Sequence, residues 1–262
     1  MPRQPPQKER DAMRVVIQED YRKMCKWASD YIAARIKTHR EDRPFVLGLP
    51  TGSSPIGVYQ ELVRQNRAGE LSFANVVTFN MDEYVGLPEE HPESYHSFMW
   101  NNFFKHIDIK PENVNILDGN AEDLAKECAD YEARIVEAGG IDLFMGGVGE
   151  DGHIAFNEPG DDFGLETHVV DLTESTIEAN KRFFESRDEV PRHALSMGIK
   201  NIMSAKKVLL LASGKNKAKA VYESFFGPIV PGVPASVLQL HNDVIVIADE
   251  EALSLCREKG VI

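Results

Sequence analysis

The chain has 262 residues, of which 42% are hydrophobic and 27% are charged, a length and balance suited to one large α/β domain. Its formal net charge of -13 argues against a nucleic-acid partner, because a phosphate backbone repels such a surface. No apolar run approaches the roughly 18 residues that a membrane span needs, so we expect no membrane partner either.

The cysteines and the first residues bear on the cellular compartment. Cys25, Cys128 and Cys256 lie far apart and form no CxxC pair. This spacing favours a reduced, cytoplasmic protein without structural zinc. Residues 1–12 are rich in proline and charge and lack the apolar core of a secretory signal. We expect them to be a disordered extension, and residues 13–262 to form a single domain.

Five short apolar runs, each ending in a glycine-rich or acidic loop, alternate with segments of helical length. Because their hydrophobicity is continuous, we expect strands covered on both faces, as in a parallel sheet. The expected order is helix 19–39, strand 45–49, helix 54–69, strand 75–80, helices 94–107 and 122–140, strands 141–147 and 207–213, helix 213–227, strand 243–249 and helix 250–259. This order predicts an α/β fold, an open, doubly wound, Rossmann-like and mainly parallel sheet with helices on both faces.

Ligands of such sheets bind beyond the carboxyl ends of the strands, so the loops there are candidates for a site. The first candidate loop runs through Gly52, Ser53 and Ser54 into a helix. Glycine lets the backbone approach a ligand, and a helix start offers unpaired N–H groups and a positive dipole end. We expect a cradle for the phosphate of a metabolite, since the nucleotide pattern GxxxxGK[ST] is absent. An ordinary serine N-cap is the alternative.

The second candidate loop, 81–86, places Asp82 and Glu83 at a strand exit. A carboxylate there can act as a general base toward a carbon acid if partial burial raises its pKa. An Asp after a strand is also a common turn or helix-capping residue, which is the structural alternative.

The third candidate segment, GGVGEDGHIAFNEPG (146–160), holds Glu150, Asp151, His153 and Glu158. An imidazole among carboxylates suits a proton relay, in which a carboxylate fixes the tautomer while the ring passes protons. The spacing matches no familiar zinc pattern, so we expect no metal. An Asx turn at Asp151 beside a solvated histidine is the structural alternative.

A phosphate also needs cations. The segment 213–218 supplies Lys215 and Lys217, and ANKRFF (179–184) supplies Lys181 and Arg182. Arg grips a phosphate with two parallel bonds, whereas Lys acts as a point charge.

At these motifs the chain closely resembles the glucosamine-6-phosphate deaminase family, also called glucosamine-6-phosphate isomerases. NMDEYVGL (80–87) and GHIAFNEP (152–159) carry the resemblance together, and it extends from about residue 13 to about residue 249. It implies an enzyme of amino-sugar catabolism that converts glucosamine 6-phosphate and water to fructose 6-phosphate and ammonia. The implied partner is a small-molecule sugar phosphate, with no metal or organic cofactor.

The resemblance also implies roles for individual residues. His153, oriented by Asp151 and Glu158, would open the sugar ring, and Asp82 would move a proton from C2 to C1. Glu83 is expected to be structural. The expected phosphate ligands are Gly52, Ser53, Ser54, Arg182 and Lys217, the last preferred over Lys215.

The segment after NEP departs from part of that family. Regulated members bind the activator N-acetylglucosamine 6-phosphate there with serines and an Arg-x-Lys. This chain has Asp161 and Asp162, then His168-Val169-Val170. Because two acids repel a phosphate, we expect no activation by that compound. A monomer and a homo-oligomer, including a hexamer, both stay open.

Three alternatives to the deaminase function remain open. A 6-phosphogluconolactonase-like hydrolase needs no base over C2, and a ribose-5-phosphate isomerase needs no ring-opening relay of this form. A non-catalytic sugar-phosphate sensor domain would keep the phosphate loop and could lose Asp82, Asp151, His153 and Glu158, all of which are present.

Overall fold

The computed structural model describes residues 13–160 and 162–262. The disorder expected for residues 1–12 and the position of Asp161 therefore lie outside the described residues. A seven-stranded sheet has the order β1-β10-β9-β6-β2-β3-β5, and its neighbouring strands are all parallel. The strands are β1 (Met13–Gln18), β2 (Phe45–Leu49), β3 (Val76–Asn80), β5 (Val114–Asn115), β6 (Leu143–Gly147), β9 (Val208–Ala212) and β10 (Val244–Asp249).

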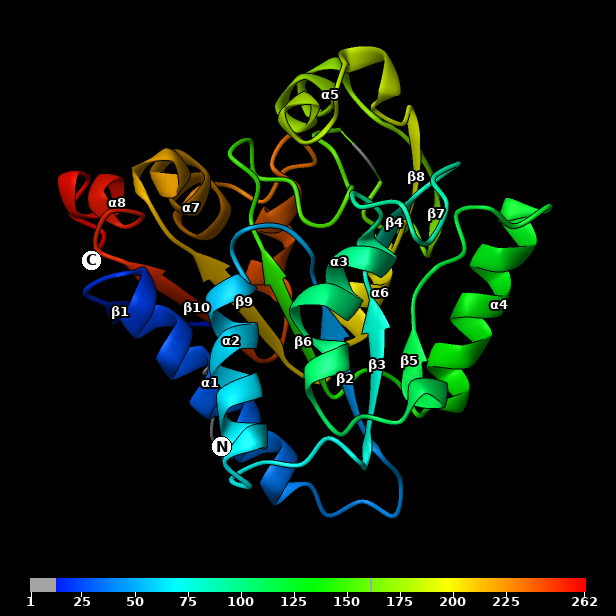
Figure 1. The fold of residues 1–262 in the computed structure, drawn as a ribbon. Helices are drawn as coiled ribbons and strands as arrows, with labels where there is room; N and C mark the ends of the chain where they lie inside the picture. Colours follow the sequence, from blue (N-terminus) through cyan, green and yellow to red (C-terminus); the bar gives the residue numbers. More distant parts are fainter. Residues whose placement is uncertain (1–12, 161) are drawn as a thin grey trace, which may run out of the picture.

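Helices cover both faces of this sheet (Figure 1). One face packs against α1 (Tyr21–Thr38), α2 (Ile56–Arg67) and α3 (Tyr95–Asn102). The other face packs against α4 (Leu124–Glu137), α6 (Ile199–Ser204), α7 (Ala218–Phe226) and α8 (Ser254–Glu258). Short 3-10 turns are η1 (Phe104–His106), η2 (Pro111–Asn113), η3 (Lys181–Phe183), η4 (Arg187–Glu189), η5 (Lys215–Lys217) and η6 (Pro234–Leu240). The expected Rossmann-like α/β fold is confirmed.

Strand β9 shows why the expected strands lack a polar face. Val208 and Leu210 point into the layer with α4, α6, α7 and α8, whereas Leu209 and Leu211 point into the layer with α1, α2 and α3. Side chains alternate between the two faces of a strand, and both faces here are dry. A continuous apolar run therefore has the composition that a central parallel strand requires.

The structure also contains a second sheet, which was not predicted from the sequence. It has three antiparallel strands in the order β4-β8-β7, namely β4 (Asp82–Tyr84), β8 (His193–Ser196) and β7 (His168–Asp171). These strands have three or four residues each, too few to give a readable alternation. The edge strands β1 and β5 of the main sheet were also not expected, and α7 begins at Ala218, later than expected.

The order of the main sheet determines where a ligand can bind. From β2 the chain proceeds to β3 on one side, whereas β6 pairs with β2 on the other side. The crevice of an open α/β sheet lies at such a reversal, beyond the carboxyl ends of the strands. In Figure 1, α5 (Glu174–Asn180) lies over this carboxyl edge. None of the helices among the described residues is both long and apolar enough to span a membrane.

Candidate functional site

The loop after β2 is held in an open conformation. Gly52 has a φ of +89°, a left-handed conformation that favours glycine. The loop is anchored from α1 by Tyr21, whose hydroxyl lies 3.1 Å from the carbonyl oxygens of both Ser53 and Ser54 and accepts from the Gly57 N–H at 3.0 Å. Tyr21 was not singled out from the sequence, because no local pattern connects it to a loop more than thirty residues away.

The unpaired N–H groups at this turn belong to the loop rather than to the start of the helix. The serine N-cap considered above is wrong, since α2 is preceded by Pro55 and has no side-chain cap. The N–H groups of Ile56 and Gly57 are already bound, to the Ser53 carbonyl and to the Tyr21 hydroxyl. None of the hydrogen bonds among the described residues uses the N–H of Gly52, Ser53 or Ser54. The loop therefore presents unpaired donors, which is what a phosphate cradle requires.

Asp82 begins strand β4, where it pairs with Ser196 of β8. Its side chain is buried, with the residue 6% exposed, and no described residue donates a hydrogen bond to its Oδ1. Burial, and secondarily the charge of Glu83, raises the pKa of Asp82 to about 8. A carboxyl group of this kind is close to the protonation balance of a general base at neutral pH.

Glu83 takes the structural role considered for Asp82. Its carboxylate accepts the N–H groups of Tyr84, Tyr95 and His96 at 2.8, 3.0 and 2.8 Å. Two of these N–H groups belong to the first turn of α3, so Glu83 caps that helix. The capping role thus belongs to one of the two adjacent acids, and the other is left without it.

The structure brings Asp151, His153 and Glu158 together. One ligand-capable atom from each lies within 4.8 Å of the others. The His153 Nδ1 and Asp151 Oδ1 atoms are 2.7 Å apart, and this interaction is the largest cause that lowers the pKa of Asp151 to about 2. The group is therefore a close imidazole–carboxylate pair beside a second carboxylate, residue types that suit a proton relay.

The Asx turn considered as an alternative is present as well, since Asp151 Oδ1 also accepts the His153 N–H at 3.1 Å. His153 is not simply solvated, because its side chain is 32% exposed. Two glycines shape the turn. A Cβ on Gly149 would lie 2.3 Å from the His153 ring, and a Cβ on Gly152 would meet Val233 at 2.7 Å. Close packing therefore favours glycine at these two positions, against the imidazole at Gly149 and against Val233 at Gly152.

One buried hydroxyl connects the relay loop to Asp82. Ser196, the partner of Asp82 in the β4–β8 pair, accepts the N–H of Phe156 at 3.0 Å through its Oγ. Phe156 lies between His153 and Glu158 in the sequence. Ser196 was not singled out from the sequence, because its contact with Asp82 depends on the β4–β8 pairing.

The two candidate phosphate cations lie near each other. Lys217 in η5 is half-buried, whereas Lys215 is exposed. Burial lowers the pKa of Lys217, the carboxylates of Glu150 and Asp151 oppose that effect, and the charge of Arg182 in η3 adds to it. Like charges gathered at one edge favour an anion between them. The loop of Ser54 reaches the same edge, since a Cβ on Gly147 would lie 3.8 Å from the Ser54 side chain.

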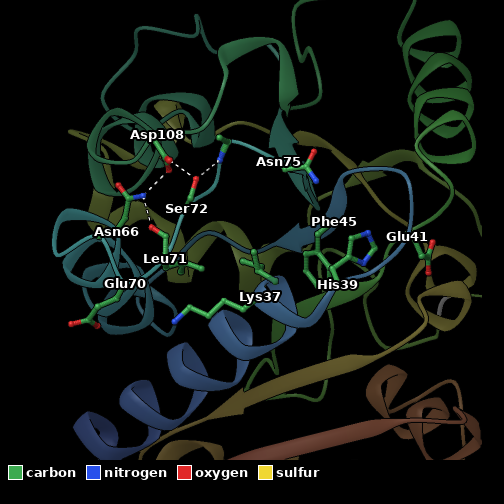
Figure 2. Close-up of a pocket in the computed structure, with 13 residues that line it drawn as sticks. Lys37, His39, Glu41, Phe45, Asn66, Glu70, Leu71, Ser72, Asn75 and Asp108 are labelled. Carbon is green, nitrogen blue, oxygen red and sulfur yellow. Dashed lines mark hydrogen bonds between the residues drawn. The ribbon is translucent and has the colours of Figure 1, made fainter.

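A cavity of about 540 Å³ lies elsewhere, at the amino edge of the sheet (Figure 2). It is lined by the end of α1, including Lys37 and His39, and by the segment that joins α2 to β3. Asp108 beside it accepts from Asn66 and Ser72, both at 2.6 Å. No site residue expected from the sequence lines this cavity.

A Rossmann-like sheet with acid/base groups and cations beyond its carboxyl ends defines the class: an α/β protein with a candidate small-ligand site at that edge. The comparisons identify the family. The chain belongs to the family described as glucosamine-6-phosphate isomerases/6-phosphogluconolactonase, whose sequence model matches residues 19–247.

Individual relatives agree with this assignment. The chain is 54% identical to a glucosamine-6-phosphate deaminase of Parabacteroides distasonis over 243 residues, which are 92% of this chain and 90% of that one. It is 54% identical to a glucosamine-6-phosphate deaminase of Thermoanaerobacter sp. strain X514 over 249 residues, 95% of this chain and 97% of the relative. The solved structure of a monomeric glucosamine-6-phosphate deaminase superposes with a TM-score of 0.89 at 46% identity, covering 93% of this chain and 100% of that one. A 6-phosphogluconolactonase of Thermotoga maritima, 20% identical with a TM-score of 0.72, covers 91% of this chain and all of its own and shares the fold.

Proposed function

We propose that this protein is a glucosamine-6-phosphate deaminase, which converts glucosamine 6-phosphate and water to fructose 6-phosphate and ammonia. Family membership and the relatives that carry this name support the reaction. The observation that carries the proposal is Asp82, a buried carboxyl group at the carboxyl edge with no donor to its Oδ1 among the described residues. A lactone hydrolysis would need no such base.

Ring opening would be the first step. His153 would take the proton of the C1 hydroxyl and return a proton to the ring oxygen, which breaks the C1–O5 bond and leaves an open aldehyde. The contact of its Nδ1 with Asp151 would fix the ring and stabilise the imidazolium that forms. Glu158, in the same group, would complete the relay.

Proton transfer between adjacent carbons would follow. Asp82 would remove the proton from C2, giving an enolamine, and return it to C1, giving an imine at C2. Water would then add to the imine carbon, and collapse of that adduct would give the ketone and release ammonia, so that the atoms balance. Positioned acid/base catalysis of this kind contributes roughly 10²–10⁴-fold to a rate.

The substrate phosphate would lie on the loop of Gly52, Ser53 and Ser54. The unpaired N–H groups of that loop support this position. Lys217 and Arg182 would neutralise the phosphate charge, consistent with their electrostatic coupling.

The test measures ammonia and fructose 6-phosphate formed from glucosamine 6-phosphate by the wild type and by Asp82→Asn. We expect turnover in the wild type, and a loss of roughly 10²–10⁴-fold in kcat for the variant with substrate binding retained. A folded wild type that binds sugar phosphates without turnover would contradict the proposal and favour a lactonase or a sensor domain. Equal turnover in both proteins would mean that another group is the base.

We further propose that the enzyme is not activated by N-acetylglucosamine 6-phosphate. Asp162 is exposed after the NEP segment, and its Oδ1 accepts the Gly164 N–H at 2.8 Å, so this position offers negative charge rather than a phosphate ligand. Substrate saturation should be hyperbolic and unchanged by that compound. Sigmoidal kinetics that become hyperbolic when the compound is added would contradict the proposal. The oligomeric state can be measured on the same sample.

A further inference from the structure

Helix α5, which lies over the carboxyl edge in Figure 1, contacts the relay directly. The Thr176 hydroxyl on this helix donates to Glu158 Oε1 at 2.6 Å. Glu158 is buried, with 6% of the residue exposed, and Thr176 is half-buried. A buried carboxylate depends on such donors for its orientation, because water cannot easily replace them.

The proton of this hydroxyl has a defined direction. Thr173, the N-cap of α5, accepts the Thr176 N–H at 3.3 Å. The Thr173 hydroxyl in turn donates to Thr176 Oγ1 at 3.0 Å. Since one lone pair of Thr176 receives this hydrogen bond, its own O–H is free to point at Glu158. The helix cap therefore orients the donor as well as starting the helix.

The helix that carries Thr176 is itself anchored. Ile177 is 2% exposed and packs in a small apolar cluster with Tyr84 and Phe156. The Asn180 side chain donates to the Tyr84 hydroxyl at 2.8 Å. These contacts tie α5 to the strand of Asp82 and to the relay loop.

We propose that Thr176 is a positioning residue for the relay: it holds Glu158 in the orientation that lets the carboxylate serve His153. The inference rests on the function proposed above and adds to it a residue outside the expected site. Since Arg182 follows on η3, directly after α5, one segment would both position the relay and contribute to phosphate binding.

The test compares kcat and KM for Thr176→Val, which removes the hydroxyl, and Thr176→Ser, which keeps it. We expect about a tenfold lower kcat for the valine variant, the factor that loss of one hydrogen bond to a charged group gives, with KM changed less than about twofold. The serine variant should recover most of the activity. Thr38→Val is the matched control, because its hydroxyl bonds the Ala34 carbonyl at the exposed end of α1.

The decisive measurement is the same change in a Glu158→Gln background. If Thr176 acts through Glu158, the valine substitution should change kcat there by less than about twofold, because residues that act as a unit are non-additive. An equal tenfold loss in both backgrounds, or no loss in the wild-type background, would overturn the proposal. Thr176→Ala replaces the valine variant if thermal unfolding shows that the latter does not fold. Absence of turnover in the wild type would instead count against the proposed reaction.

Discussion

The two edges of the main sheet carry the same set of groups in different surroundings. At the carboxyl edge Asp151, His153 and Glu158 lie within 4.8 Å of one another, and at the amino edge His39, Glu41 and Asp142 do the same. The amino-edge carboxylates are paired with cations. Arg43 binds both oxygens of Asp142 at 2.9 and 2.6 Å, and Lys206 contacts Glu41 at 2.7 Å and Asp142 at 3.0 Å.

The histidine rings at the two edges also differ in their partners. At the amino edge, His39 Nε2 lies 2.9 Å from the Arg43 carbonyl, and its ring packs edge-on against Phe45 (Figure 2). At the carboxyl edge, His153 Nδ1 faces a carboxylate, and a nearby lysine has a lowered pKa. A cluster of one histidine and two acids is therefore no sign of chemistry by itself. Cations that already neutralise the acids make such a cluster structural.

Replacing each histidine in turn should give the largest difference in kcat between the two edges. His153→Gln is expected to lower kcat by roughly 10²–10⁴-fold, because the relay loses its proton-transferring group. His39→Gln should leave kcat within about twofold of the wild type, since that imidazole only closes a structural contact. Ammonia release at saturating glucosamine 6-phosphate measures both. Similar losses of kcat in the two variants would contradict a catalytic role for His153 and a structural role for His39.

The lysines provide the next comparison. Lys217→Met should raise KM for glucosamine 6-phosphate by about 10–100-fold, the cost of one charge-assisted hydrogen bond. Lys206→Met, the same change at the amino edge, should leave KM unaltered. Inhibition by inorganic phosphate offers a readout without turnover and should weaken only in the Lys217 variant. An unchanged KM in Lys217→Met would remove this lysine from the phosphate site.

The smallest expected effects concern stability, where the two edges should differ in sign. Burial raises the pKa of Asp82 to about 8, so between pH 4 and 8 the native state keeps a proton that the unfolded chain releases, and stability falls as pH rises. Asp82→Asn should therefore raise Tm by a few degrees at pH 8, and this gain should fade toward pH 4.

Asp142 should behave in the opposite way. Burial alone would raise its pKa, but hydrogen bonds from Arg43, the Val46 N–H and Lys206 together lower it. Its stabilising contribution is present above its usual pKa near 4 and is lost as pH falls below that value. Asp142→Asn should lower Tm at pH 8 by a few degrees, with turnover per folded molecule unchanged. Thermal unfolding of both variants at pH 4 and pH 8 checks the signs, and shifts of the same sign at pH 8 would contradict the comparison.

Local sequence patterns predicted much of the main sheet and the loops at its carboxyl edge. The apolar runs predicted the five central strands of the main sheet, because a strand buried on both faces needs apolar residues at every position. The candidate loops after β2, β3, β6 and β9 followed from the rule that ligands bind beyond parallel strand ends. Strands β4, β7 and β8 were missed, because three or four residues are too short for a periodic pattern.

The sequence by itself thus determined the class of fold, the edge of the sheet that carries the candidate site and the residue types that meet there. The resemblance already implied a structural role for Glu83, but only the tertiary structure showed that Glu83 caps α3, while no described residue donates to Asp82 Oδ1. It also brought Tyr21 to the loop after β2 and Thr176 to Glu158. These contacts join residues 18 or more positions apart and depend on how separate elements pack. Burial and hydrogen-bond partners are properties of that packing, and no local pattern of residues encodes them.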